Sequence, residues 1–234
     1  MDRPKIICHI LQSVDGNIDG SFFSQPETIP ALREFSRIRE EYACDAVISG
    51  AITASEIYSN SLADDLPEVL ETYSRTDWQA AKADKYAVII DGEGTILWQS
   101  GTVERRGDKM HVVTILQENV SDAYIAHLRQ AGVSYVFAGK DSLDLPLAVR
   151  KLKEQFGIEK MLLSGGGIVD WVFLQAGLID EISLIIPPVI DGGTGLASAF
   201  DDSAFAENHR PKALALIGVQ RLEGDCIWLR YKAI

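Results

Sequence analysis

The sequence predicts an α/β protein with a mostly parallel sheet, and three features of its pattern predict it. Short apolar, β-branched runs alternate along the chain with segments in which apolar residues have helical spacing. These runs are nearly continuous rather than alternating with polar residues, which is typical of strands covered by helices on both faces. The end of the chain, residues 213–233, reads instead as two strands joined through Glu223, Gly224 and Asp225, which predicts an antiparallel hairpin.

The individual elements follow from the same pattern. Strands are expected at the apolar runs, which are residues 5–13, 46–49, 86–91, 111–115, 134–139, 160–164 and 181–186. Helices are expected where apolar residues recur every three or four positions, at residues 30–42, 122–131, 145–156 and 168–176. Ser121 is a suitable N-cap for the second helix, and Gly157 is a suitable stop for the third. No linker-like composition divides the chain, so we expect one domain over residues 1–234.

The charge balance argues against several classes of partner. The 234 residues include 22 Lys and Arg and 34 Asp and Glu, which gives a formal net charge of −12. Because nucleic-acid binding depends on neutralising phosphates, this charge argues against nucleic acid and against anionic membrane surfaces. No segment approaches the roughly 20 apolar residues of a membrane span. The expected partner is a small molecule.

Cysteine and histidine usage predicts neither disulfides nor a metal site. Cys8, Cys44 and Cys226 are an odd number, they are far apart, and no CxxC pair is present. No pair of histidines has the spacing of metal ligands, so no metal is expected. The N-terminal segment lacks the apolar core of a signal peptide. We therefore expect a cytoplasmic protein with reduced thiols.

Three consecutive glycines, Gly165, Gly166 and Gly167, separate the expected strand at 160–164 from the expected helix at 168–176. A strand, a glycine turn and a helix N-terminus form a common anion site, because the first helical amides are unpaired and the helix dipole is positive there. The dinucleotide fingerprint GxGxxG does not fit, since Asp170 stands where a glycine is needed, and no P-loop is present. The alternative is a close packing turn that binds nothing.

Other expected strands also end in small or polar residues. Gly50 and Thr53 follow the run at 46–49, and Asp91 with Gly92 follows the run that begins at residue 86. Ser13, Asp15 and Asn17 follow the first strand. Ligands of open parallel sheets bind beyond the carboxyl ends of the strands, so these residues together predict a binding cleft. Each of them alone is also typical of an ordinary turn.

Four segments resemble a known family in the same order along nearly the whole chain. They are HILQSVDGNIDG (9–20), DAVISGAIT (45–53), YAVIIDGEG (86–94) and LLSGGGIVDWVFLQAGLIDEISLIIPPVIDGG (162–193). They are similar to the reductase domain of the bacterial bifunctional riboflavin-biosynthesis deaminase–reductase, in the dihydrofolate reductase-like superfamily. The resemblance implies a dihydrofolate reductase-like fold, NADPH as cofactor, a homodimer, and hydride transfer to C1 of the ribose of a ribosylaminouracil. The zinc signature of the deaminase, HxE…PCxxC, is absent from the sequence.

The resemblance also implies roles for the matching residues. The cofactor pyrophosphate is expected at Gly165, Gly166, Gly167 and Ile168. Contacts to the rest of the cofactor are expected from Gly50 and Thr53, and from Asp91 and Gly92 on its adenosine side. The nicotinamide and substrate end is expected to be lined by Ser13, Asp15 and Asn17.

Two residues depart from the family pattern and leave the substrate open. Asn17 stands where the riboflavin reductases usually have lysine, and Ser164 stands where they usually have glutamate. Both positions are associated with the phosphoribosylaminouracil in that family, so Ser164 and Asn17 are candidate substrate-binding residues for a different small substrate. Two alternatives stay open, a non-catalytic nucleotide-binding or sensing protein of the same fold and a structural domain without a ligand.

Asp15 and a basic segment have competing interpretations. With a raised pKa, Asp15 could relay the proton that hydride reduction requires, while the simpler interpretation is a turn that it makes with Gly16. Arg105, Arg106 and Lys109 are candidates for the 2′-phosphate of NADPH, while the simpler interpretation is a solvated charged loop.

Overall fold

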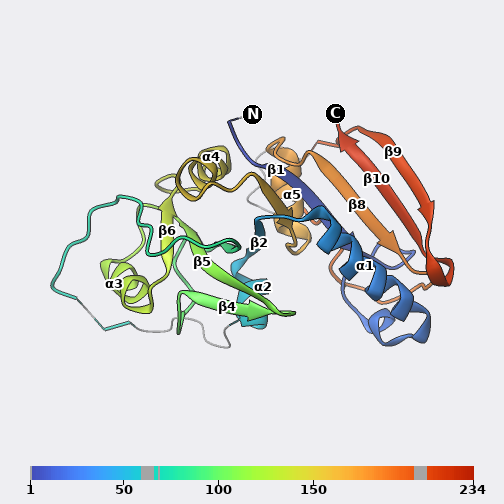
Figure 1. The fold of residues 1–234 in the computed structure, drawn as a ribbon, viewed down its shortest axis with the longest axis horizontal. Helices are drawn as coiled ribbons and strands as arrows, with labels where there is room; N and C mark the ends of the chain where they lie inside the picture. The colour runs from blue at the N-terminus through green and yellow to red at the C-terminus, as the bar shows by residue number, and fades with distance from the viewer. Residues whose placement is uncertain (1, 59–65, 68, 203–209) are drawn as a thin grey trace. The chain divides into compact units, whose positions relative to one another are not determined.

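The computed structural model describes residues 2–58, 66–67, 69–202 and 210–234, which form two compact units. Unit 1 contains residues 45–161 with the first few residues of the chain. Unit 2 contains residues 5–44 and 162–234. Figure 1 labels most of the helices and strands of the two units.

Unit 1 is built on four parallel strands. They are β2 (Ala46–Gly50), β3 (Tyr86–Ile90), β5 (Asp108–Leu116) and β6 (Ser134–Phe137). Strand β3 lies between β2 and β5, and β6 pairs with the second half of β5. A short strand, β4 (Thr102–Arg105), runs antiparallel to the first half of β5. The unit has three helices among its described residues, α2 (Ala51–Tyr58), α3 (Asp122–Ala131) and α4 (Leu145–Phe156).

Apolar side chains from α3 and the strands form the core of unit 1. Trp98, Tyr124 and Tyr135 are among its largest fully buried side chains. Burying one such side chain contributes roughly 1.5–3 kcal/mol. The core is thus concentrated around β3, β5, β6 and α3, which holds the carboxyl ends of these strands in place.

The helix ends of unit 1 agree with the capping signals in the sequence. The Ser121 hydroxyl accepts a hydrogen bond from the Tyr124 amide at 3.2 Å, and Gly132 ends α3 with a φ of 72°. Gly157 ends α4 with a φ of 70°. Because glycine adopts this left-handed conformation without a steric penalty, the predicted stops are confirmed.

Unit 2 combines parallel and antiparallel pairing. Its strands are β1 (Lys5–Leu11), β8 (Glu181–Ile186), β9 (Leu214–Arg221) and β10 (Ile227–Ala233). Strand β1 is parallel to β8, while β10 is antiparallel to both β8 and β9. The unit contains two α-helices among its described residues, α1 (Ile29–Tyr42), which contacts β1 and β8, and α5 (Gly167–Gln175). Strand β7 (Lys160–Leu163) carries the chain from unit 1 into unit 2.

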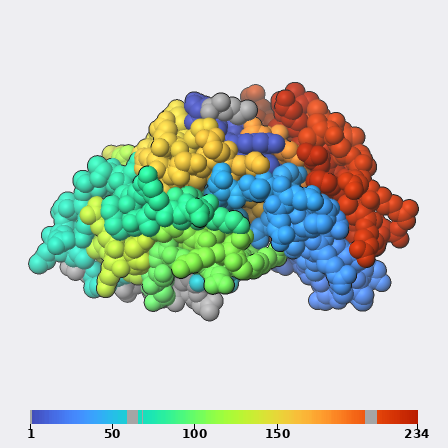
Figure 2. Space-filling model, viewed as in Figure 1, coloured from blue at the N-terminus to red at the C-terminus, as the bar shows by residue number. Residues whose placement is uncertain are grey.

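The C-terminal hairpin of β9 and β10 is confirmed, and it ends unit 2 at an open strand. Several apolar side chains of β9 are exposed, among them Leu216, Ile217 and Val219. The hairpin, coloured red, lies at the surface in Figure 2. An apolar edge strand of this kind is a surface to which another chain can bind.

The predicted α/β class is confirmed, with two differences in the elements. Helix α2 was not predicted, because AITASEIY contains β-branched residues that favour strands over helices. Strand β4 was not predicted either, because its run TVER is short and half charged. No helix in the described part of the chain is both long enough and apolar enough to cross a bilayer.

Candidate functional site

The glycine triplet lies where the sequence predicts it, at the corner between β7 and α5. Strand β7 ends at Leu163 and α5 begins at Gly167, with Gly166 as its N-cap residue. Gly166 has a φ of −71° and a ψ of 165°, and no side chain of the described residues caps the start of the helix. The helix therefore keeps amide donors and the positive end of its dipole at this corner.

The three glycines have different surroundings. A Cβ on Gly165 would lie 2.8 Å from Cβ of Val169, and a Cβ on Gly167 would lie 2.2 Å from the carbonyl oxygen of Ser198. Close packing therefore requires glycine at both positions, which is the role that the simpler interpretation gives them. Gly167 is buried, whereas Gly165 and Gly166 are partly exposed and Ile168 is 43% exposed. The accessible part of the corner is thus Gly165, Gly166 and Ile168.

A loop over residues 198–201 covers Gly167. The carboxylate of Asp201 accepts hydrogen bonds from the Ser198 amide, at 3.0 and 3.1 Å, and from its hydroxyl. A Cβ on Gly167 would lie 2.6 Å from Oδ2 of Asp201. Sequence reasoning missed this loop, because no local pattern marks its approach to a glycine more than thirty positions earlier.

Asp15 joins two loops of unit 2. Its carboxylate accepts hydrogen bonds from the Ser13 hydroxyl at 2.6 Å, the Asn17 side-chain amide at 3.3 Å, and the backbone amides of Gly192 and Asp191 at 2.8 and 3.1 Å. The Ser13 hydroxyl and then these backbone amides lower the pKa of Asp15 to about 2. A proton relay requires a raised pKa, so this shift argues against that role, and the catalytic role of Asp15 stays a prediction. The structure favours the turn, in which the Gly16 amide bonds to the Ser13 carbonyl at 3.0 Å.

Asp191 extends this network to a third loop. Its carboxylate accepts hydrogen bonds from the Phe22 amide at 2.8 Å and from the Ser21 hydroxyl at 3.2 Å. The same side chain accepts from the Gly193 amide at 3.1 Å. Sequence reasoning missed Asp191, although the turn-forming DGG at 191–193 is a signal that could have found it.

The first loop and the glycine corner are linked through the loop at 197–201. Asn17 forms a β-bridge with Ser198, and the Ile18 amide bonds to the Ala197 carbonyl at 2.9 Å. Because Ser198 and Asp201 cover Gly167, the predicted substrate residues and the glycine corner belong to one connected set of contacts. Ser164, which directly precedes the corner, is partly buried. Unit 2 therefore brings together the predicted residues from both ends of the chain.

The remaining predicted residues lie in unit 1, at the carboxyl ends of two paired strands. Gly50 ends β2 opposite Ile90, the last residue of β3, and α2 begins at the next residue. Thr53 lies in the first turn of α2 and is partly exposed. Gly92 packs so closely that a Cβ on it would lie 3.2 Å from Leu143. The predicted cofactor contacts of Gly50, Thr53 and Gly92 stay predictions.

Asp91 has a structural role in unit 1. Its buried carboxylate accepts hydrogen bonds from the amide and the hydroxyl of Thr95, both at 2.8 Å, from the Ile96 amide at 3.1 Å and from the Tyr124 hydroxyl at 2.9 Å. The pKa of Tyr124 is raised, first by burial and then by the charge of Asp91. The structure favours the turn interpretation of Asp91 over a ribose contact, because the carboxylate is engaged inside the protein.

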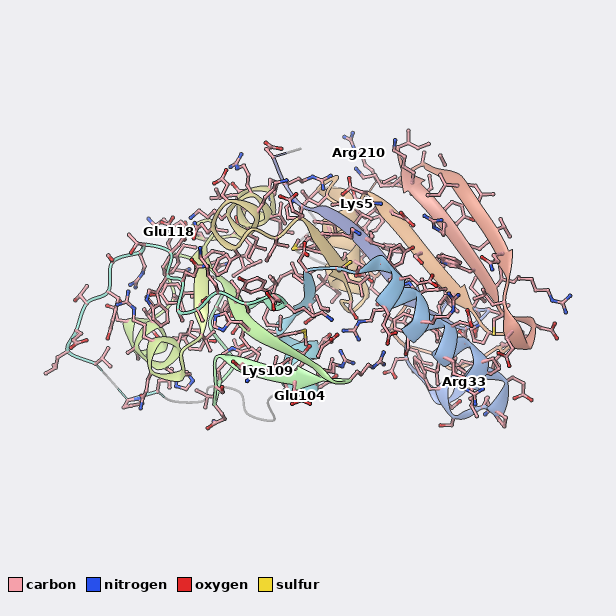
Figure 3. All side chains as sticks on the ribbon, in the orientation of Figure 1. Lys5, Arg33, Glu104, Lys109, Glu118 and Arg210 are labelled. Carbon is pink, nitrogen blue, oxygen red and sulfur yellow. The ribbon has the colours of Figure 1, made fainter. Side chains whose placement is uncertain are left out.

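The basic segment lies at the amino end of β5, whereas Gly50 and Asp91 lie at the carboxyl ends of β2 and β3. Arg105 pairs with Asp108 across the turn between β4 and β5, so the segment is at the start of β5. Figure 3 shows Lys109 on this hairpin and Glu118 beyond the other end of β5. At about 3.3 Å per residue, the nine residues of β5 separate the two ends by on the order of 25 Å. This position favours the solvated charged turn over the 2′-phosphate site, which stays a prediction.

Comparison with known proteins gives the family. The family model described as the RibD C-terminal domain matches residues 4–227. The chain belongs to this family. A 2,5-diamino-6-ribosylamino-4(3H)-pyrimidinone 5′-phosphate reductase of Methanothermobacter thermautotrophicus is 29% identical over 207 residues, which is 88% of this chain and 87% of that relative.

Solved structures show the same fold. A pyrimidine reductase-like protein of Corynebacterium diphtheriae superposes with a TM-score of 0.67 at 20% identity, over 99% of this chain and 92% of that one. RibD of Acinetobacter baumannii superposes with a TM-score of 0.61 at 21% identity, and this chain spans 59% of its length. The predicted family and fold class are thus confirmed.

Proposed function

We propose that this protein is an NADPH-dependent reductase that converts the ribosylamino group of a pyrimidine 5′-phosphate to a ribitylamino group. The observation that carries the proposal is the family match over residues 4–227, together with a relative named as such a reductase over 88% of the chain. The names of the relatives favour this enzymatic prediction over the non-catalytic alternative.

The glycine corner supports a nicotinamide cofactor with a diphosphate. Gly165 and Gly166 expose backbone at the uncapped start of α5, so amide donors and the helix dipole can hold an anion without a lysine. In a protein with a net charge of −12, such local donors are a suitable source of attraction for a diphosphate. When bound, NADPH supplies the hydride. Preference for NADPH over NADH is part of the proposal.

The chemistry at the sugar requires one hydride and one proton. The ring-opened ribosylamine is an imine between C1 of the sugar and the amino nitrogen. Hydride addition to C1 and protonation of the nitrogen give the ribitylamine, so each turnover consumes one reduced cofactor and one proton. Asp15 is ionised at neutral pH, so we assign proton delivery to water and give Asp15 the task of holding the loop of Ser13 and Asn17.

The substrate residues favour the diaminopyrimidinone over the uracil. Ser164 and Asn17 are uncharged where the riboflavin reductases usually carry glutamate and lysine, so recognition must use hydroxyl and amide groups. The Methanothermobacter relative is named for the 2,5-diamino substrate. We therefore expect the higher kcat/KM with 2,5-diamino-6-ribosylamino-4(3H)-pyrimidinone 5′-phosphate.

The test is steady-state oxidation of NADPH by the purified protein with each of the two pyrimidines. The proposal predicts substrate-dependent loss of reduced nicotinamide and a ribitylamino product by mass spectrometry. Binding of NADPH without turnover of either pyrimidine would instead support the non-catalytic alternative. Absence of both binding and turnover would contradict the proposal and favour a structural domain.

We also propose that the protein is a cytoplasmic homodimer. The exposed apolar side chains of β9, including Leu216, Ile217 and Val219, support burial of this strand by a second copy. Sedimentation equilibrium tests the oligomeric state. A monomer over the micromolar concentration range would contradict the homodimer.

A further inference from the structure

Helix α5 carries a buried carboxyl group directly beneath the glycine corner. Asp170 lies in the first turn of α5 and is 1% exposed. A Cβ on Gly165 would lie 3.2 Å from Oδ1 of Asp170, so the carboxyl packs against the Gly165 backbone. The sequence shows Asp170 as a single acid within the apolar segment GIVDWVFL, which gives no sign of this contact.

The polar atoms of Asp170 are unusual because they are unpaired. Within the described part of the chain, neither carboxyl oxygen makes a hydrogen bond of normal geometry. The groups that face it are the Cys8 thiol of β1 and the Gly165 amide, with the charge of Asp201 farther away. An unsatisfied buried polar group costs about 1–3 kcal/mol, so its presence here calls for a role.

A neutral carboxyl at Asp170 would be compatible with an anion bound at the glycine corner. Burial raises the pKa of Asp170 well above its usual range, and burial also raises the pKa of the Cys8 thiol. Both shifts favour the uncharged form of the group. An ionised carboxylate at this point would offset the positive potential of the helix N-terminus and repel a diphosphate held by the amides above it.

We propose that Asp170 is a positioning residue, whose buried carboxyl supports the Gly165 backbone from within and fixes the amides of the corner for a diphosphate. This inference rests on the proposed function, because the diphosphate is that of NADPH. It differs from a packing role, since a leucine of similar size would fill the same space but could not offer a polar contact to the Gly165 amide.

Two substitutions separate the polar contact from the packing. Asp170→Asn keeps the shape and the polar atoms without a charge, and we expect a Kd for NADPH within about twofold of the wild-type value. Asp170→Leu keeps the volume alone, and we expect a Kd raised by about tenfold or more, because the Gly165 backbone loses its polar neighbour. Isothermal titration calorimetry with NADPH measures both, and thermal unfolding checks that each variant is folded.

A matched control separates positioning from general destabilisation. Glu181 is another buried acid of unit 2, bonded to Arg230 at 2.7 Å and to Tyr42 at 2.8 Å. Glu181→Gln should lower the melting temperature and leave the Kd for NADPH unchanged. Cys8→Ala should also leave the Kd unchanged, because the thiol is not the supporting group.

The protonation of Asp170 gives a readout that is independent of the cofactor. A carboxyl with a raised pKa holds its proton more tightly in the folded than in the unfolded protein, so the stability it contributes is full below its unfolded pKa of 3.8 and decreases as the pH rises above it. In Asp170→Asn this decrease should be absent, and so should the infrared carbonyl band of the protonated carboxyl.

The outcomes distinguish this inference from the proposed function. Loss of affinity in Asp170→Leu with rescue in Asp170→Asn supports the inference. Equal Kd values in wild type, Asp170→Leu and Asp170→Asn would overturn it while leaving the NADPH proposal intact. If the wild-type protein binds no NADPH, the proposed function fails, and this inference fails with it.

Discussion

Two strands of the molecule, β3 and β7, are each followed by a buried aspartate, and the two carboxyl groups have opposite surroundings. After β3, the buried carboxylate of Asp91 accepts hydrogen bonds from Thr95, Ile96 and Tyr124. After β7, the carboxyl of Asp170 has no hydrogen-bond partner among the described residues. Asp91 thus stabilises the fold after β3. Asp170 is instead a buried carboxyl without a hydrogen-bond partner among the described residues, and it lies next to the proposed cofactor site.

Removal of the hydrogen-bonded carboxylate of Asp91 should have the largest effect on stability. Asp91→Ala leaves the amides of Thr95 and Ile96 and the Tyr124 hydroxyl buried without their acceptor, so we expect a loss of about 3 kcal/mol or more in the free energy of unfolding. Urea denaturation measures it. Asp170→Ala is the matched substitution and should cost much less, because no donor among the described residues loses its acceptor. Equal losses of unfolding free energy in the two variants would contradict the difference between the Asp91 and Asp170 carboxyl groups.

The packing role of the glycine corner gives the next largest effect. In Gly167→Ala the new Cβ lies 2.2 Å from the Ser198 carbonyl, so the backbone must shift, at an expected cost of about 1–3 kcal/mol. Gly218→Ala in β9 is the control, because its Cβ would be 3.7 Å from Arg230, which is an ordinary contact. If the two variants unfold at the same urea concentration, the 198–201 loop does not constrain Gly167.

A smaller effect concerns the pH dependence of stability. Because the folded pKa of Asp15 is about 2, below its unfolded value of 3.8, the stability it contributes is full above pH 3.8 and is lost as the pH falls through 2. Asp15→Asn should therefore weaken the loss of stability between these two pH values. Thermal unfolding over this range measures it. An unchanged pH profile would show that the network of Ser13 and Gly192 does not hold the carboxylate.

The smallest expected effect is at the basic turn of unit 1. Arg105→Ala and Lys109→Ala should leave the KM for NADPH unchanged, because the turn is at the start of β5 and away from the carboxyl ends of the strands. Steady-state kinetics with NADPH measures it. A tenfold rise in KM in either variant would restore the 2′-phosphate interpretation of this segment.

Local signals were enough to predict most elements but not the roles of the site residues. Helices α3 and α4 were predicted from the spacing of their apolar residues, and Ser121 and Gly157 marked ends of these helices because each acts on its own neighbours. The contact partners of Gly167 and Asp91 could not be predicted, because Ser198 and Tyr124 are distant from them in sequence. Tertiary contacts decide whether an acid at a strand end faces a ligand or the core.

The central claim is that uncapped amides at the start of α5 hold the diphosphate of NADPH, and Gly166→Asp tests it most directly. Aspartate is a favourable N-cap residue, so the variant should be at least as stable as the wild type. Its carboxylate would occupy the first-turn amides and repel a diphosphate. Ser121→Asp adds the same charge at the N-cap of α3 and serves as the control.

The measurement is the Kd for NADPH by calorimetry in the wild type and these two variants. The account predicts tight binding of NADPH by the wild type and by Ser121→Asp. Binding by Gly166→Asp should be at least about a hundredfold weaker, which is about 2.8 kcal/mol of binding free energy. An unchanged Kd in a folded Gly166→Asp variant would contradict it.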